Sequence, residues 1–117
     1  MELFDIKQIY KDFQYPSSIV KAVNLNLVDF EYWYLMTEEQ VETRIKGLMK
    51  RYPNRKLIPF ARRDDCDTIA CFEIGKETKV QIIHDFASEG YEQREEYNDF
   101  WDWMKAAIDE LILKEED

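Results

Sequence analysis

Three short runs of strand-forming residues follow one another closely in the middle of the chain, and they constrain its fold strongly. Residues 57–62, 68–74 and 79–85 are rich in apolar β-branched and aromatic side chains. The break at 63–67 contains three aspartates, whose short carboxylates favour turns by accepting hydrogen bonds from nearby backbone amides. Strands joined by so short a connection pair antiparallel, so the first two runs predict a hairpin and the third predicts its extension into a meander.

Helical patterns occur on both sides of these strands. Apolar residues recur every three to four positions over residues 3–13, 16–24 and 37–52, and again from residue 98 onward. Asn98 is a natural N-cap for the last of these segments. The pattern therefore predicts helices before, between and after the strands.

The helix over 37–52 has the clearest start signal. The sequence Thr37-Glu38-Glu39-Gln40 has the form of a capping box, in which Thr37 accepts a hydrogen bond from the backbone of Gln40 and the Gln40 side chain reaches back. Pro53-Asn54 ends the segment. Five apolar residues share one face and are predicted to be buried, namely Val41, Ile45, Leu48, Met49 and Tyr52.

Aromatic residues dominate segment 29–36 and predict a strand there. Alternation places Trp33 on one face of this strand and the rings at positions 30, 32 and 34 on the other. Since one face belongs to the core, Trp33 is a candidate for a ring left over to contact a partner. Residues 86–97 hold mostly acidic, amide and small side chains and predict a surface loop.

Length and composition limit the chain to one domain. A chain of 117 residues with 45% apolar and 15% aromatic residues has the size and the apolar content of a single folded unit. We expect one α+β domain over residues 1–117, with an antiparallel or mixed sheet packed against N-terminal, middle and C-terminal helices. No apolar run reaches membrane-spanning length, and the start lacks a signal-peptide pattern, so the expected location is the cytoplasm, with no membrane partner.

Opposite charges are separated along the chain. Residues 44–63 carry eight Lys or Arg and no Asp or Glu, whereas residues 85–117 carry twelve acidic and three basic residues. The basic segment is expected to dock against acidic neighbours or to be solvated, and whether it is itself a binding surface stays open. Because the formal net charge is −9, the surface should repel nucleic-acid phosphates and favour a basic protein partner.

The residue combinations that catalysis requires are missing from the sequence. The single histidine, His84, shares its strand face with apolar residues, which indicates a structural imidazole. Cys66 and Cys71 have no second pair of zinc ligands, and a cytosolic compartment keeps thiols reduced. We predict no catalytic, metal-binding or cofactor-binding residue; a small hydrolase that uses carboxylates such as Asp64, Asp65 or Glu73 is the enzymatic alternative.

Two kinds of side chain favour contact with another protein. Tyr and Trp are enriched at protein interfaces, and carboxylates in segments 64–67 and 85–99 suit a basic partner. Trp101 and Trp103 cannot both lie at the centre of the last helix's buried stripe, so one of them should be near the surface, close to Tyr91 and Tyr97 if the acidic loop folds back. The candidate partner-binding residues are Trp33, Asp64, Asp65, Asp67, Glu89, Tyr91, Glu92, Glu95, Glu96 and Trp101.

The order of several short motifs resembles the SUKH superfamily, which includes Knr-type cell-wall-assembly regulators and many bacterial immunity proteins. The resemblance spans about residues 10–113. It starts with a Pro-led helix and a Trp-bearing segment and ends with a Phe-x-x-Trp-apolar helix. The matching segments are Tyr15-Pro16-Ser17-Ser18, Tyr32-Trp33-Tyr34-Leu35, Leu57-Ile58-Pro59-Phe60-Ala61, Phe72-Glu73-Ile74, Lys79-Val80 and Phe100-Trp101-Asp102-Trp103-Met104.

The resemblance implies an α+β domain that works by binding, without a cofactor or a catalytic residue. Many bacterial members are immunity proteins that bind and neutralise a cognate toxin. We therefore expect a non-enzymatic protein-binding module of the immunity type with a basic toxin as partner. A regulatory adaptor or a self-associating structural module of the same fold is the alternative, and a homodimer stays open.

Overall fold

Five antiparallel strands form a single sheet in the computed structural model, in which residues 3–30 and 32–116 are described. Their order across the sheet follows their order in the chain. Thr68 pairs with His84 and Val80 with Tyr97, so the predicted meander of three strands is confirmed and extended at both edges. The strands are β1 (Trp33–Leu35), β2 (Leu57–Arg63), β3 (Thr68–Glu73), β4 (Val80–His84) and β5 (Gln93–Tyr97).

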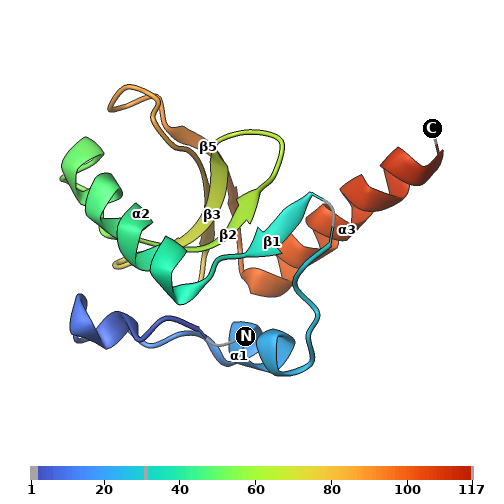
Figure 1. Cartoon of the computed structure of the whole chain (residues 1–117), viewed down its shortest axis with the longest axis horizontal. Coiled ribbons are helices and arrows are strands. Elements are labelled where there is room, and N and C mark those ends of the chain that lie inside the picture. Colours follow the sequence, from blue (N-terminus) through green and yellow to red (C-terminus); the bar gives the residue numbers. More distant parts are fainter. Residues whose placement is uncertain (1–2, 31, 117) are drawn as a thin grey trace.

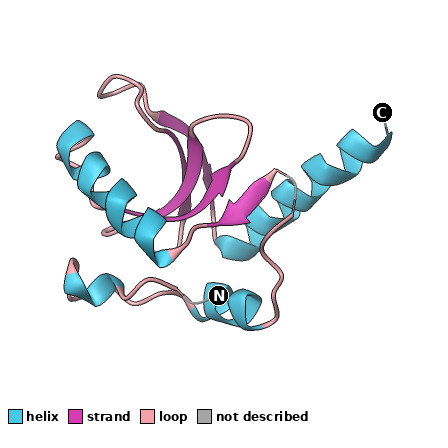
Figure 2. Cartoon of the chain, in the orientation of Figure 1, coloured by secondary structure: helices cyan, strands magenta, loops and turns pink. Residues whose placement is uncertain are grey.

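Helices cover the sheet on two sides and confirm the α+β class. In Figure 1, α2 (Glu38–Arg51) and α3 (Phe100–Glu116) lie on opposite sides of the sheet, and α1 (Ser17–Asn24) lies below it. Figure 2 shows that the segment before α1 is mostly loop, with one turn of 3₁₀ helix at Ile6–Gln8. Alternation along β3 separates two apolar clusters: Ile69 and Cys71 pack with Leu48 of α2, and Ala70 and Phe72 pack on the α3 side.

Aromatic rings form the centre of the core between the sheet and α3. Phe60 stacks on Phe72 at 4.8 Å between ring centroids, and Trp103 meets Phe60 edge-on at 5.1 Å. Trp33 packs against Trp103 edge-to-face at 5.4 Å and is only 4% exposed. Trp33 is therefore a core residue, and its prediction as an exposed interface ring is wrong, because the last helix supplies a second tryptophan that covers it.

Two predicted elements are shorter than expected. The helix predicted over 3–13 is reduced to the single turn at Ile6–Gln8, where Asp5 makes no capping hydrogen bond, although Phe4 and Phe13 nearby are buried. The strand predicted over 29–36 is confined to β1, since Phe30 and Trp33 exchange two backbone hydrogen bonds that fold the chain back on itself. The spacing of apolar residues alone predicts neither the short 3₁₀ turn nor the backbone turn between Phe30 and Trp33.

Three further details of the structure differ from the sequence predictions: the exposure of Met49, the state of residues 93–97 and the cap of α3. Met49, predicted to lie in the buried face of α2, is 47% exposed. Residues 93–97, predicted as loop, form the edge strand β5, whose mostly exposed polar side chains carry no apolar strand pattern. Asp99 rather than Asn98 caps α3, because its Oδ1 accepts a hydrogen bond from the Asp102 amide at 2.8 Å.

The predicted capping box at the start of α2 is confirmed and gives the first testable prediction. The Thr37 hydroxyl accepts from the Gln40 amide at 3.2 Å, and Gln40 Oε1 accepts from the Thr37 amide at 2.9 Å. Replacing Thr37 by alanine should lower the free energy of unfolding by about 1 kcal/mol, measured by urea denaturation. Thr37→Ser keeps the accepting oxygen and should retain most of that stability; equal losses in both variants would contradict the role of the cap.

Candidate functional site

Two loops leave the same end of the sheet, which we call the loop end: residues 63–67 and residues 85–92. They meet there because the strands are antiparallel, so that the end of β2 and the end of β4 are neighbours of the start of β3. The Asp85 amide donates to the Asp67 carbonyl at 3.2 Å. Both loops project from the same end of the sheet in Figure 1.

The loop 85–92 is fastened at its start by a buried carboxylate. Asp85 is fully buried, and its two oxygens accept from Arg51 Nε and Nη2, both at 2.8 Å, and from Arg44 Nη1 at 2.9 Å. Its Oδ1 also accepts from the Phe86 amide at 2.8 Å. Charge-assisted hydrogen bonds with this geometry are about twice as strong as neutral ones. The sequence analysis expected the basic segment 44–63 either to dock against acidic neighbours or to be solvated. At Asp85 the segment docks against an acidic neighbour.

The next residue, Phe86, is held in an unfavourable backbone conformation with its ring in solvent. Its φ of 70° lies in the left-handed region, where a residue with a Cβ loses about 1–2 kcal/mol. The ring is 59% exposed and lies 4.1 Å from the guanidinium carbon of Arg51 and 5.6 Å from that of Arg44. The contacts of Asp85 over-determine this conformation, which is how backbone strain persists in native structures.

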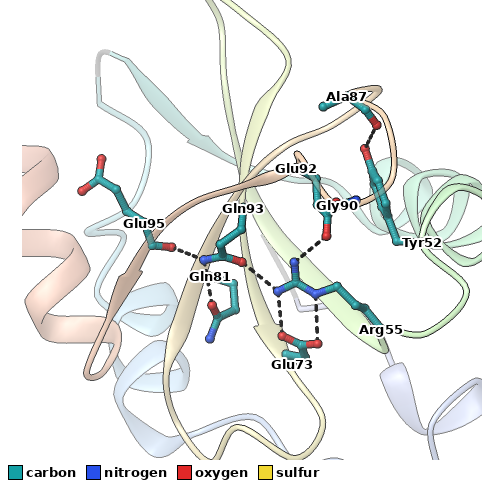
Figure 3. A network of polar contacts seen from close by, with 9 residues as sticks. All are labelled: Tyr52, Arg55, Glu73, Gln81, Ala87, Gly90, Glu92, Gln93 and Glu95. Atoms are coloured by element: carbon teal, nitrogen blue, oxygen red, sulfur yellow. Dashed lines mark hydrogen bonds and ion pairs between the residues drawn. The ribbon is translucent and has the colours of Figure 1, made fainter.

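A second network fastens the loop at its far end (Figure 3). Arg55 donates to both oxygens of Glu73, at 2.8 and 3.1 Å, and to Glu92 at 2.9 Å. It also donates to Gln93 Oε1 at 2.8 Å, while the other Glu92 oxygen accepts from the Gly90 amide at 2.7 Å. Midway along the loop, the Tyr52 hydroxyl donates to the Ala87 carbonyl at 2.7 Å, so the loop is held at three points.

The ionisation of Glu92 reflects this network. Burial raises the pKa of its carboxyl, but hydrogen bonds from Arg55 and from the backbone of Glu92 and Gly90 outweigh burial and hold the pKa below its ordinary value. On Arg55, burial lowers the pKa and the hydrogen bonds to Glu73 and Glu92 raise it, with a net increase. Both groups therefore stay charged at neutral pH.

This network predicts a pH-dependent stability difference. Glu92→Gln should lower the free energy of unfolding at pH 7 by about 1–3 kcal/mol, because the amide leaves Arg55 short of one charged partner. The lowered pKa of Glu92 means that its contribution is present above the ordinary glutamate value and is lost as the pH falls through the lowered one. Urea denaturation at pH 7 and pH 3 should show a smaller difference from the wild type at pH 3.

The matched control is Glu89→Gln on the same loop, where the side chain is exposed. It should change the free energy of unfolding by no more than about 0.5 kcal/mol at either pH. A Glu92→Gln deficit of the same size at both pH values would contradict an ionised Glu92 in the folded state.

The loop end presents aromatic and acidic groups to solvent. Tyr91 is 74% exposed, and Phe86 lies on the same loop. The exposed carboxylates of Asp64, Asp67 and Glu89 belong to the same pair of loops. Four of the predicted partner-binding residues, Asp64, Asp67, Glu89 and Tyr91, thus lie on the two loops of the loop end.

Three other predicted residues line a separate groove of about 550 Å³ between the sheet and α3, namely Trp33, Asp65 and Glu95. Arg63 also lines this groove. It donates hydrogen bonds to Asp65 at 2.8 and 2.9 Å and to Glu110 at 2.8 and 3.0 Å. The hydrogen bonds from Arg63 hold the pKa of Asp65 down at about 2. The charges of Asp65 and Glu110 are therefore already matched within the molecule.

The remaining predicted residues do not join either surface. Glu92 is 6% exposed and bound to Arg55, so its prediction as a partner-facing carboxylate is wrong. Glu96 accepts from Gln81 Nε2 at 2.8 Å on the exposed edge strand. Trp101 is 36% exposed but lies at the start of α3, at the opposite end of β5 from the loop end, so it is not close to Tyr91.

Sequence reasoning missed the two residues that define the loop end most strongly, Asp85 and Phe86. The signal was available in part, since an aromatic residue in a polar loop has no helical or strand pattern to explain it. The partners of Asp85 lie 34 and 41 positions earlier in the chain, and no local pattern reports such pairing.

Within the part of the chain that the structure describes, no group of three or more His, Cys, Asp and Glu side chains is placed to hold a metal ion. None of the described helices has the length and apolar character needed to cross a bilayer. Comparisons with protein-family models, with curated proteins and with solved structures found no significant match to this chain.

Proposed function

We propose that this chain is a non-enzymatic protein-binding module that contacts its partner through the loop end. One observation carries the proposal: loop 85–92 is fastened at three points, yet it leaves Phe86 and Tyr91 59% and 74% exposed. Contacts within the chain hold the loop in place, but they leave the apolar surface of the two rings in water, where it contributes no burial free energy. A partner that covers both rings recovers it.

The geometry of the loop end suits a protein partner. Large rigid aromatic residues contribute most of the energy at interfaces, and a surface that is ordered before binding loses little entropy on association. Phe86 cannot turn inward, because its backbone conformation is set by Asp85 beside it. The rings therefore form a preorganised contact surface.

The charges of the loop end favour a basic partner. Asp64, Asp67 and Glu89 are exposed on the two loops of the loop end, in a chain of formal net charge −9. Opposite charges raise the association rate at low salt and select against acidic competitors. Binding should therefore weaken as the salt concentration rises.

Together with the order of motifs that resembles the SUKH superfamily, these features favour a cytoplasmic immunity protein with a basic toxin as its partner. The matching test is co-expression of the chain with a basic, growth-arresting protein encoded beside it. Wild-type chain should restore growth, and the purified pair should form a complex in isothermal titration calorimetry. Restoration with no direct complex would contradict neutralisation by binding.

Two loop variants test the proposed surface. Tyr91→Ala and Phe86→Gly should each weaken the complex by about 30-fold or more, the effect of removing an interface hot spot. Glycine tolerates the positive φ at position 86, so this variant removes the ring without adding strain to the backbone. Trp101→Ala is the matched control, since it removes a half-exposed ring at the opposite end of the sheet; if it alone weakened the complex, the loop end would not be the contact surface.

A charge-reversal test of the carboxylates has to leave Glu92 unchanged. Reversing Glu92 to lysine would break the Arg55 network and disturb the loop itself. Lysine at positions 64, 67 and 89 changes only exposed charges and should slow association and reduce its dependence on salt. An unchanged association rate in this triple variant would remove these carboxylates from the proposal.

A self-associating module is the second candidate, favoured by α3. Its C-terminal half extends away from the sheet in Figure 1 and exposes Ile108, Ile112 and Leu113 by 40%, 49% and 63%. A dimer through this face would be insensitive to salt and to changes in the loop end. Light scattering with Ile112→Lys distinguishes the two candidates, because only self-association would be lost.

A further inference from the structure

One arginine of the basic segment, Arg62, forms no ion pair with a carboxylate in the described part of the chain. The segment holds five arginines, and four of them bind carboxylates, whereas Arg62 binds none among residues 3–30 and 32–116. Its Nε is buried and has no hydrogen-bond partner, and its guanidinium carbon lies 5.8 Å from the centroid of the Tyr34 ring. Buried donors are nearly always paired in native proteins, so this Nε is an exception in a chain with 25 acidic residues.

Arg62 lines a cavity of about 440 Å³ together with Arg44 of α2. In the β2–β3 register Arg62 is opposite Ile69, whose side chain belongs to the apolar cluster on the α2 side. Arg44 uses one terminal nitrogen, Nη1, for Asp85, at 2.9 Å, which leaves its remaining N–H groups free to bind a second acceptor. Thr37 and Thr43 add hydroxyls to the same wall.

We propose that this cavity binds a small carboxylate ligand, with Arg62 as its main contact and Arg44 as the second. Arg62 is partly exposed, and its guanidinium fork matches the two oxygens of a carboxylate. Glu39 also lines the cavity and opposes a doubly charged phosphate more than a singly charged carboxylate. The inference is independent of the loop end and of any protein partner.

The experiment is a titration of the intact chain with sodium acetate at constant ionic strength, followed by the arginine Nε–Hε signals in ¹⁵N-correlated NMR spectra. The Arg62 signal, assigned by its absence in Arg62→Gln, should shift along a saturable curve. Arg62→Gln should weaken binding at least tenfold, as read from the backbone amide signals of Thr37 and Thr43. Arg94→Gln, which removes another arginine without a carboxylate partner, should leave the curve unchanged.

Two further arms make the proposal falsifiable. Arg62→Lys keeps the charge without the fork and should bind acetate more weakly than the wild type, so equal binding would overturn a guanidinium-specific site. In a parallel titration at pH 8, inorganic phosphate should bind the wild-type chain more weakly than acetate does. A linear shift without saturation, or saturation by phosphate alone, would overturn the carboxylate assignment.

Discussion

Replacing Asp85 by asparagine should lower the free energy of unfolding by about 3–5 kcal/mol, the cost of removing one partner from a buried ion pair. The carboxylate is fully buried, and Arg44 and Arg51 both direct their hydrogen bonds at it. An amide supplies one accepting oxygen and no charge, so two partly buried guanidinium groups lose their counter-ion. Urea denaturation followed by circular dichroism measures the loss.

The control for this prediction is Asp67→Asn, in the neighbouring loop. The Asp67 side chain is exposed, and the backbone carbonyl that accepts from the Asp85 amide is retained. This change should alter the free energy of unfolding by no more than about 0.5 kcal/mol. A small effect in both variants would show that the buried pair contributes little to stability.

Truncating Trp103 to alanine should cost about 3–5 kcal/mol, the range for removing a large aromatic side chain from a core. Trp103 is 1% exposed and contacts Trp33, Phe60 and Phe100 at centroid distances of 5.1–5.5 Å. Trp101 is two residues away on the same helix but 36% exposed, so Trp101→Ala should cost about 1 kcal/mol or less. The same urea denaturation compares the two variants.

A third variant separates ring packing from hydrogen bonding at this site. Trp103 Nε1 is buried and has no hydrogen-bond partner among the residues that the structure describes. Trp103→Phe keeps an aromatic ring and removes the unpaired donor, so its loss of stability should be clearly smaller than that of Trp103→Ala. Equal losses from the phenylalanine and alanine variants would contradict a core that depends on aromatic packing at this position.

The elements that follow from local patterns could be predicted from the sequence. The capping box of α2 depends on residues only three positions apart, and the three central strands depend on apolar runs bounded by turns. Edge strand β5 escaped prediction because its charged side chains are mostly solvated, so no apolar pattern accompanies its backbone pairing.

The candidate site was predictable only in part, because its geometry depends on distant pairs. Composition indicated that aromatic and acidic groups would be presented together, and Tyr91 and Glu89 do share the loop end. Alternation in β1 could not reveal that Trp103 would cover Trp33. The counting of charges could not reveal that Glu92 pairs with Arg55, 37 positions earlier.

The contacts that hold loop 85–92 join residues that are far apart in the sequence. Arg44 and Arg51 reach Asp85 across 41 and 34 positions, so Phe86 and Tyr91 acquire their places only after the middle helix has docked on the completed sheet. A half-synthesised or partly unfolded chain offers no such surface. The partner proposed above would therefore discriminate between folded and incompletely folded molecules, and its binding would protect the whole domain against unfolding by mass action.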